Sequence, residues 1–283
     1  MTTGFADLDW AGRRVRLEIA WVGDDGVQTP LIVFLHEGLG SVAMWRDFPE
    51  RLCRAVGARG LVYSRPGYGR STPRAPQERW APDFMHRQAF EVLPALVASM
   101  RRDGRIAPGK PLWLFGHSDG GSIALLHAAH ARAAQGSAAN TGEAAAGPAG
   151  IVLLAPHILV EELSVTSIAK AREAYLTTDL RARLAKYHDD PDSAFWGWND
   201  IWLAPEFRHW SIEAEIGAVR CPVLALQGAD DEYGTLEQIR GIARLVPHAR
   251  LLEIPDCGHS PHRDQPGQVI DAVVAFMREA VLA

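Results

Sequence analysis

The sequence has few cysteines, no long apolar run and no marked excess of either charge. Its 283 residues include only three cysteines, Cys53, Cys221 and Cys257, an odd and scattered set that excludes a disulfide framework and metal-ligand spacing. No apolar run approaches the roughly 20 residues that a membrane-spanning helix requires. The formal net charge is -5, which offers no basic surface to a nucleic acid or an anionic membrane.

Signals for export and for cofactors are also missing. The first ten residues contain neither the basic nor the apolar segment of a secretory signal, and the cysteine usage suits a reducing compartment, so we expect a cytoplasmic protein. No phosphate loop, dinucleotide fingerprint or metal-ligand cluster occurs, so we expect no cofactor and no metal. The expected partner is a small-molecule substrate, without nucleic acid or membrane.

Short apolar runs alternate with segments of helical periodicity. Strands are predicted at residues 30–35, 60–64, 111–115, 150–155, 221–228 and 249–254, and an alternating edge strand at residues 13–21. Helices are predicted at residues 44–56, 83–102, 235–245 and 267–281, the second kinked at Pro94. This alternation predicts the α/β class, with a mostly parallel central sheet and helices on both of its faces.

Residues 158–219 interrupt this alternation. They contain no strand pattern, look helical, and are rich in aromatic side chains in their second half. The chain therefore divides into a first core part at residues 1–157, a helical insertion at residues 158–219, and a second core part at residues 220–283. Residues 135–150 are low in complexity and are predicted to form a loop.

The strongest local motif is the run Gly116-His117-Ser118-Asp119-Gly120. It follows an apolar strand pattern and precedes a helical one. A G-x-S-x-G sequence in that context is typical of a nucleophile elbow, in which the serine has a strained backbone and an exposed hydroxyl. The two outer glycines leave room for the tight turn, and the helix N-terminus favours developing negative charge. We therefore predict that Ser118 is a nucleophile.

Polar residues gather where the predicted strands end. These clusters lie at residues 36–41, 65–71, 116–120, 156–157, 228–232 and 256–260. Ligands of parallel α/β sheets bind beyond the carboxyl ends of the strands. The clusters are therefore expected to meet at one rim, which predicts a single site built from segments far apart in the chain.

A serine nucleophile needs a general base, and the base needs a carboxylate to orient it. His259 directly follows the last predicted strand and suits proton transfer near neutral pH. Asp231 follows the strand before it and is our choice of carboxylate. Asp230 remains the alternative from the sequence alone.

The order Ser118, Asp231, His259, together with G-H-S-D-G, resembles the α/β-hydrolase fold superfamily. Residues 36–41 resemble its H-G-x-x-G-S oxyanion loop, residues 65–71 its R-x-G-x-G-x-S loop, and residues 256–259 the segment that carries its catalytic histidine. The resemblance extends over residues 13–281. It implies a helical cap at residues 158–219 above a pocket, and we place the oxyanion donors at the backbone N–H groups of Gly38 and Asp119.

One position departs from the family pattern. Glu37 stands where the family usually has glycine, and a carboxylate beside an oxyanion hole should point away, pair with a cation such as Arg65, or touch substrate. The candidate pocket residues are Glu37, His157, Trp196 and Trp198. The alternative for His157 is a helix cap, and most of the aromatic residues are expected to form the core of the insertion itself.

These features predict a serine hydrolase that cleaves a carboxylic ester or thioester bond of a small apolar or aromatic substrate. Two alternatives remain. One is hydrolysis of a carbon–carbon bond in a diketone-like ring-cleavage product, which similar enzymes perform with the same triad. The other is a ligand-binding member of the superfamily that does not turn over.

Overall fold

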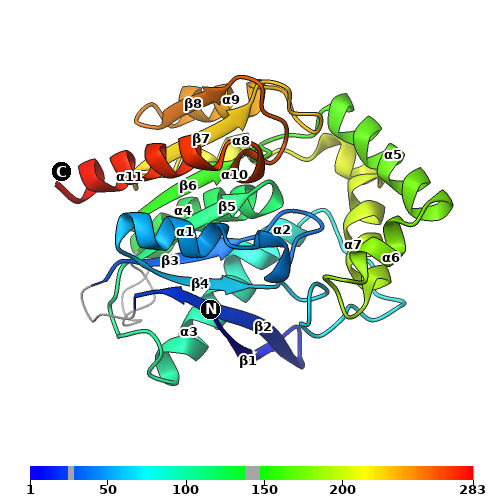
Figure 1. Ribbon diagram of the computed structural model, residues 1–283, viewed down its shortest axis with the longest axis horizontal. Helices are drawn as coiled ribbons and strands as arrows, with labels where there is room; N and C mark the ends of the chain where they lie inside the picture. The colour runs from blue at the N-terminus through cyan, green and yellow to red at the C-terminus, as the bar shows by residue number, and fades with distance from the viewer. Residues whose placement is uncertain (25–28, 138–146, 283) are drawn as a thin grey trace.

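Eight strands form one sheet in the order β1-β2-β4-β3-β5-β6-β7-β8 in the computed structural model, which describes residues 1–24, 29–137 and 147–282 (Figure 1). Strands from β4 to β8 along this order are parallel, whereas β1 and β2 pair in antiparallel fashion. The strands are β1 (Thr2–Trp10), β2 (Arg13–Gly23), β3 (Leu31–Leu35), β4 (Arg59–Tyr63), β5 (Leu112–His117), β6 (Gly150–Leu154), β7 (Val223–Gly228) and β8 (Arg250–Ile254). The predicted mostly parallel sheet is confirmed.

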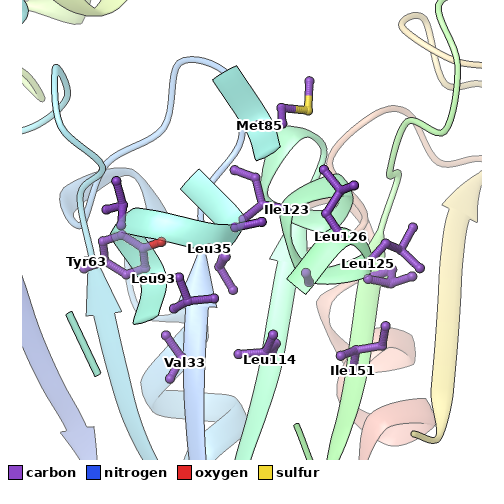
Figure 2. Packing of buried hydrophobic residues seen from close by; sticks show 14 of the residues in the cluster. Val33, Leu35, Tyr63, Met85, Leu93, Leu114, Ile123, Leu125, Leu126 and Ile151 are labelled. Carbon is purple, nitrogen blue, oxygen red and sulfur yellow. The ribbon is translucent and has the colours of Figure 1, made fainter. Parts of the chain in front are cut away.

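Helices cover both faces of the sheet, because alternate strand residues point to opposite sides. In β3, Val33 and Leu35 belong to one buried cluster, whereas Ile32 and Phe34 belong to the other. Figure 2 shows the first cluster, in which strand residues pack against Leu93 and neighbouring helical residues. That face is covered by α2 (Phe84–Arg87), α3 (Leu93–Arg102), α4 (Asp119–Ser137) and α9 (Glu237–Leu245), and the other face by α1 (Phe48–Val56) and α11 (Pro266–Leu282).

The segment between β6 and β7 is helical, as predicted. Figure 1 shows its first three helices beyond one end of the strands, at the right of the view. It contains α5 (Glu162–Thr177), α6 (Leu180–Leu184), α7 (Pro191–Trp202), a 3-10 turn (Pro205–His209) and α8 (Glu213–Ile216). The last of these, α8, packs against α4 and α9 of the sheet's helical layer. We call residues 158–219 the inserted segment.

Several predicted elements differ in detail from the structure. The strand at 13–21 is not the edge of the sheet, because the unpredicted β1 pairs along its whole length. The helix expected at 44–56 is broken at Arg46, whose φ is 54°. The irregularity expected at Pro94 is a π-helical turn, Gln88–Val92, since the proline lacks the N–H that a regular turn would use. A short helix, α10 (Pro261–Asp264), was not predicted.

The loop predicted at residues 135–150 begins later than expected. Helix α4 continues to Ser137, and residues 138–146 of that prediction lie outside the described residues. In the described ranges, every helix is too short or too polar to span a bilayer.

Candidate active site

Ser118 occupies a strained turn between β5 and α4. Its φ is 53°, a left-handed conformation that non-glycine residues avoid and that costs about 1–3 kcal/mol. Two backbone hydrogen bonds hold it there: the Ser118 N–H donates to the Leu154 carbonyl at 2.8 Å, and the Gly121 N–H donates to the Ser118 carbonyl at 2.8 Å. The sequence prediction of a strand–turn–helix elbow is thereby confirmed in its geometry.

The glycines of the motif are required by close backbone contacts. A Cβ on Gly116 would lie 2.2 Å from the carbonyl oxygen of Gly120. A Cβ on Gly120 would lie 2.1 Å from the carbonyl oxygen of Leu35 in β3. Any side chain at either position would therefore displace the turn that carries Ser118.

Asp231, rather than its neighbour Asp230, contacts His259. The Nδ1 atom of His259 lies 2.8 Å and 3.0 Å from the two carboxylate oxygens of Asp231. The carboxylate also accepts the N–H groups of Tyr233 at 2.8 Å and Gly234 at 3.2 Å. Burial raises the pKa of Asp231, but these bonds and the charge of His259 outweigh it and hold the pKa below its usual value. Asp230 is solvent-exposed.

His259 is arranged as a base with one free nitrogen. The contact with Asp231 places its proton on Nδ1, which leaves Nε2 as an acceptor. Burial lowers the pKa of His259. The hydrogen bond to Asp231 and the charge of that carboxylate raise the pKa by more than burial lowers it, so it lies above its usual value. The carbonyl of His259 accepts a bond from Nε2 of the buried His117 at 2.7 Å, and His117 packs beneath the elbow.

A cavity of about 100 Å³ brings Ser118 and His259 together. Core loops supply one wall, and side chains of α5 and α7 in the inserted segment supply the other. The lining residues are Glu37, Gly38, Leu39, Ser118, His157, Ile168, Trp198, Trp202, Tyr233 and His259. The predicted rim is thus where the cavity lies.

The two predicted pocket tryptophans lie on different sides of α7. Trp198 lines the cavity, but Trp196 does not. Trp196 packs instead against Tyr175, with ring centroids 5.4 Å apart. Residues two positions apart in a helix are separated by about 200° around its axis, so Trp196 and Trp198 cannot share a face. Trp202 lies one turn beyond Trp198 and on the same face of α7. The helical spacing between these two tryptophans is the sequence signal that could have identified Trp202 as a cavity residue.

His157 faces the cavity and does not cap a helix. It is 3% exposed, and its Nδ1 has no hydrogen-bond partner among the described residues. Burial, and secondarily the charge of His259, lowers the pKa of His157 to about 3. The Ser122 hydroxyl donates to the carbonyl of His157 at 2.6 Å, which fixes its backbone. His157 therefore presents a neutral imidazole to the cavity.

Two backbone donors are open beside Ser118. In the part of the chain that the structure describes, no backbone acceptor bonds the N–H of Gly38 or that of Asp119. Gly38 lines the cavity, and a Cβ there would lie 2.2 Å from Nε1 of Trp198. A side chain at this position would therefore require Trp198 to move. The two open N–H groups are those expected from the sequence.

The carboxylate of Glu37 is paired, but not with Arg65. Its oxygens lie 3.4 Å from Nη2 of Arg263 and 3.5 Å from Nδ1 of His117. Burial raises the pKa of Glu37, but the contact with His117 and the charge of Arg263 outweigh it, so the pKa lies well below its usual value. The predicted pairing with Arg65 is wrong, because that guanidinium bonds the backbone carbonyl of Glu37 and faces Asp119.

The described residues contain no group of three or more His, Cys, Asp or Glu side chains able to hold a metal ion. Around the cavity, the carboxylate of Asp231 pairs with His259 and that of Glu37 with Arg263. A serine beside a carboxylate–imidazole pair is an arrangement that can perform proton transfer to and from the hydroxyl.

Comparisons with known proteins agree with this architecture. The sequence model described as the alpha/beta hydrolase family matches residues 32–272. The mouse sn-1-specific diacylglycerol lipase ABHD11 is 26% identical over 277 residues, which cover 90% of this chain and 83% of the mouse protein.

Solved structures are similar in fold over nearly the whole chain. The proline iminopeptidase of Mycobacterium smegmatis has a TM-score of 0.71 at 15% identity, covering 99% of each chain. The enol-lactonase of Burkholderia xenovorans has a TM-score of 0.67 at 20% identity, covering 97% of this chain and 100% of the other. The family match, which spans most of the sequence, confirms the resemblance and the fold class predicted above: this chain belongs to the α/β-hydrolase family.

Proposed function

We propose that the protein is a serine hydrolase that cleaves a carboxylic ester or thioester bond of a small substrate. The observation that carries this proposal is the meeting of a strained Ser118 and His259 in one cavity, with Nδ1 of His259 2.8 Å from the buried carboxylate of Asp231. A nucleophile, a base and a group that orients the base are the three parts that acyl transfer to serine requires.

In the proposed reaction the Ser118 hydroxyl attacks the substrate carbonyl. Nε2 of His259 takes its proton, and Asp231 stabilises the imidazolium that forms. The N–H groups of Gly38 and Asp119 stabilise the oxyanion. His259 then returns the proton to the leaving oxygen or sulfur, and the bond to the leaving group breaks. Water, activated by His259, releases the acid from the acyl-enzyme and restores the serine.

The paired state of Glu37 removes one objection to this site. A free carboxylate beside the oxyanion would oppose the negative charge that develops there. Arg263 and His117 lie against the Glu37 carboxylate at 3.4 Å and 3.5 Å. The guanidinium of Arg263 offsets the charge of Glu37.

The proposed substrate carries a short, apolar acyl group. The cavity of about 100 Å³ is well below the roughly 300–1,000 Å³ of sites that take drug-sized ligands. Its lining is largely apolar and aromatic. We propose that the inserted segment, residues 158–219, acts as a cap on the core formed by residues 1–157 and 220–283, since Ile168, Trp198 and Trp202 close one side of the cavity.

Relatives support ester chemistry in particular. A diacylglycerol lipase and an enol-lactonase both carry names of enzymes that cleave ester bonds. The iminopeptidase shares the fold with lower identity. Ester cleavage is therefore the first activity to test.

The direct test is labelling with a fluorophosphonate followed by intact mass and peptide mapping. We expect a single adduct on Ser118 and none in Ser118→Ala, with both proteins equally folded by circular dichroism. An adduct on a different serine, or no adduct on the folded wild-type protein, would contradict the assignment of Ser118.

Turnover is tested with p-nitrophenyl esters of increasing acyl length. The cavity volume predicts that kcat/KM is highest for acetyl to butyryl esters and falls for octanoyl esters. A vinylogous diketone serves as the parallel substrate. Turnover of the diketone without turnover of any ester would replace ester hydrolysis by carbon–carbon bond hydrolysis.

A further inference from the structure

Arg65 is a fully buried cation for which the proposed reaction has no role. Its side chain is 0% exposed, and Arg65 lies two residues after the end of β4. Its guanidinium carbon lies 4.7 Å from the ring centroid of Tyr68. A buried charge costs free energy unless it is paired and hydrogen-bonded, so its contacts indicate what the charge is used for.

The first contact fixes the peptide between Glu37 and Gly38. The Glu37 carbonyl oxygen accepts Nη2 of Arg65 at 2.8 Å and the N–H of Gly40 at 3.1 Å. It also lies 2.7 Å from Nδ1 of His36. Because Nε2 of His36 accepts the Arg65 N–H at 3.0 Å, the imidazole proton must be on Nδ1, and this contact is a donated bond as well.

These three hydrogen bonds to the Glu37 carbonyl determine the direction of the Gly38 N–H. The Glu37–Gly38 peptide is trans, and in a trans peptide the carbonyl and the N–H point in opposite directions. Donors that hold the carbonyl of Glu37 on one side therefore turn the N–H of Gly38 to the other. Gly38 lines the cavity together with Ser118.

The second contact reaches the residue after Ser118. Nη2 of Arg65 lies 3.5 Å from Oδ2 of Asp119, and Nε1 of Trp202 donates to Oδ1 at 3.2 Å. Asp119 is completely buried, and burial raises its pKa, although the charge of Arg65 and the bond from Trp202 oppose this. The Asp119 side chain is thus held between the core and helix α7, and its own N–H begins α4 beside Ser118.

We propose that Arg65 is the positioning residue of the oxyanion site: one buried guanidinium holds the Glu37–Gly38 peptide by its carbonyl and Asp119 by its carboxylate, and so orients both N–H donors. This inference rests on the proposed function, in which those two N–H groups bind the oxyanion. Arginine suits the task because its planar group fixes the position and direction of Nη2, which makes both contacts, whereas the lysine ammonium is a point charge on a flexible stem.

The test compares wild type with Arg65→Lys, which retains a positive charge but lacks the planar guanidinium whose Nη2 faces both groups. We expect kcat for a short p-nitrophenyl ester to fall about 100-fold with KM unchanged. We also expect inhibition by 1,1,1-trifluoroacetone, which adds to the serine as an oxyanion-bearing hemiketal, to weaken by the same factor as kcat/KM. A wild-type kcat, or a loss confined to KM, would overturn the proposal.

Arg74→Lys is the matched control. Arg74 is 8% exposed, and its guanidinium bonds the carbonyls of Ala75 and Glu78, away from the cavity. It should keep the wild-type kcat. If Arg65→Lys does not fold, Arg65→Met combined with Asp119→Asn removes both buried charges together, and it should show the same loss of kcat. A wild-type kcat in the folded double variant would again overturn the proposal.

A crystal structure of Arg65→Lys separates this inference from the proposed function. If wild type cleaves no ester, the proposed function fails, yet the orientation of the peptide can still be seen. A Glu37–Gly38 peptide turned away from its wild-type orientation supports the positioning role. An unchanged peptide together with an unchanged Asp119 side chain overturns it, whatever the activity.

Discussion

The core and the inserted segment differ in what they bring to the cavity. The core supplies Ser118, Asp231 and His259, which lie in the turn or loop that follows β5, β7 and β8, respectively. The inserted segment supplies apolar walls, chiefly Trp198 and Trp202 of α7. Under the proposed function, the core performs the reaction and the insertion limits which substrates fit.

The two regions are joined by many polar contacts. Among them, His188 of the inserted segment accepts the N–H of Gly69 on Nδ1 at 2.8 Å, and its Nε2 donates to the carbonyl of Leu39 at 3.0 Å. Trp202 donates to Asp119 beside the elbow at 3.2 Å. The roles of the two regions can therefore be tested separately, with variants that change the proposed catalytic residues, the cavity wall, or the contacts between the core and the inserted segment.

The largest effect is expected in the core. Asp231→Asn removes the group that fixes the His259 tautomer, and we expect kcat to fall about 10⁴-fold with little change in KM. Steady-state kinetics on a short p-nitrophenyl ester measure this. Asp230→Asn, one residue away and solvent-exposed, is the control and should keep wild-type kcat. Equal losses in the two variants would contradict the assignment of Asp231.

A smaller effect, of a different kind, is expected in the insertion. Trp198→Ala should enlarge the cavity, so the ratio of kcat/KM for octanoyl over acetyl esters should rise about 10- to 100-fold. Trp196→Ala, on the opposite side of α7 and away from the cavity, should leave this ratio unchanged. If both variants shift the ratio alike, α7 affects selectivity through its stability and not through the cavity wall.

The pH profile of the core should follow His259. Although burial lowers the pKa of His259, Asp231 raises it to a value above 6.5. The protonated imidazole cannot accept a proton from Ser118, so kcat/KM should fall about tenfold per pH unit below that pKa. In Asp231→Asn the midpoint should move to lower pH, since burial then acts without the carboxylate. A wild-type profile that stays flat down to pH 5.5 would contradict this.

The smallest effect concerns the attachment of the insertion. His188→Ala should lower the free energy of unfolding by about 1–2 kcal/mol, measured by urea denaturation at pH 7.5. Burial holds the pKa of His188 below 6.5, so the folded protein takes up the proton at lower pH than the unfolded chain. The contribution of His188 to the free energy of unfolding is therefore present above pH 6.5 and is lost as the pH falls below that value.

The difference between wild type and His188→Ala should accordingly shrink as the pH falls from 7.5 to 5. The exposed His209→Ala is the control and should match wild type throughout. A constant difference between wild type and His188→Ala would mean that His188 contributes by packing alone.

The sequence predicts the core far better than the insertion. A strand such as β3 is covered on both faces, so its five residues are all apolar and its end is marked by polar residues. Local patterns of this kind located Ser118, His259 and the rim without knowledge of the pairing. The unpredicted β1 is different, because only part of it is buried and its pattern is weak.

Contacts between distant segments were harder to predict. Arg65 and Glu37 were expected to pair because their loops meet at the rim, but the guanidinium bonds the Glu37 backbone and the carboxylate faces Arg263 of α10. Trp196 and Trp198 were treated alike because composition does not show which face of a helix is buried. Helical spacing identifies the face only after its neighbour is known.

The position of the insertion between two paired strands has a consequence for how this protein could diversify. Residues 158–160 pair with residues 210–212, with Leu159 opposite Ser211, so the chain enters and leaves the helices α5 to α7 at almost the same place. A different insertion joined at these two points would leave the register of the sheet unchanged. Under the proposed function, exchange of this segment by recombination replaces one wall of the cavity as a module, provided that the new segment keeps contacts equivalent to those of His188 and Trp202.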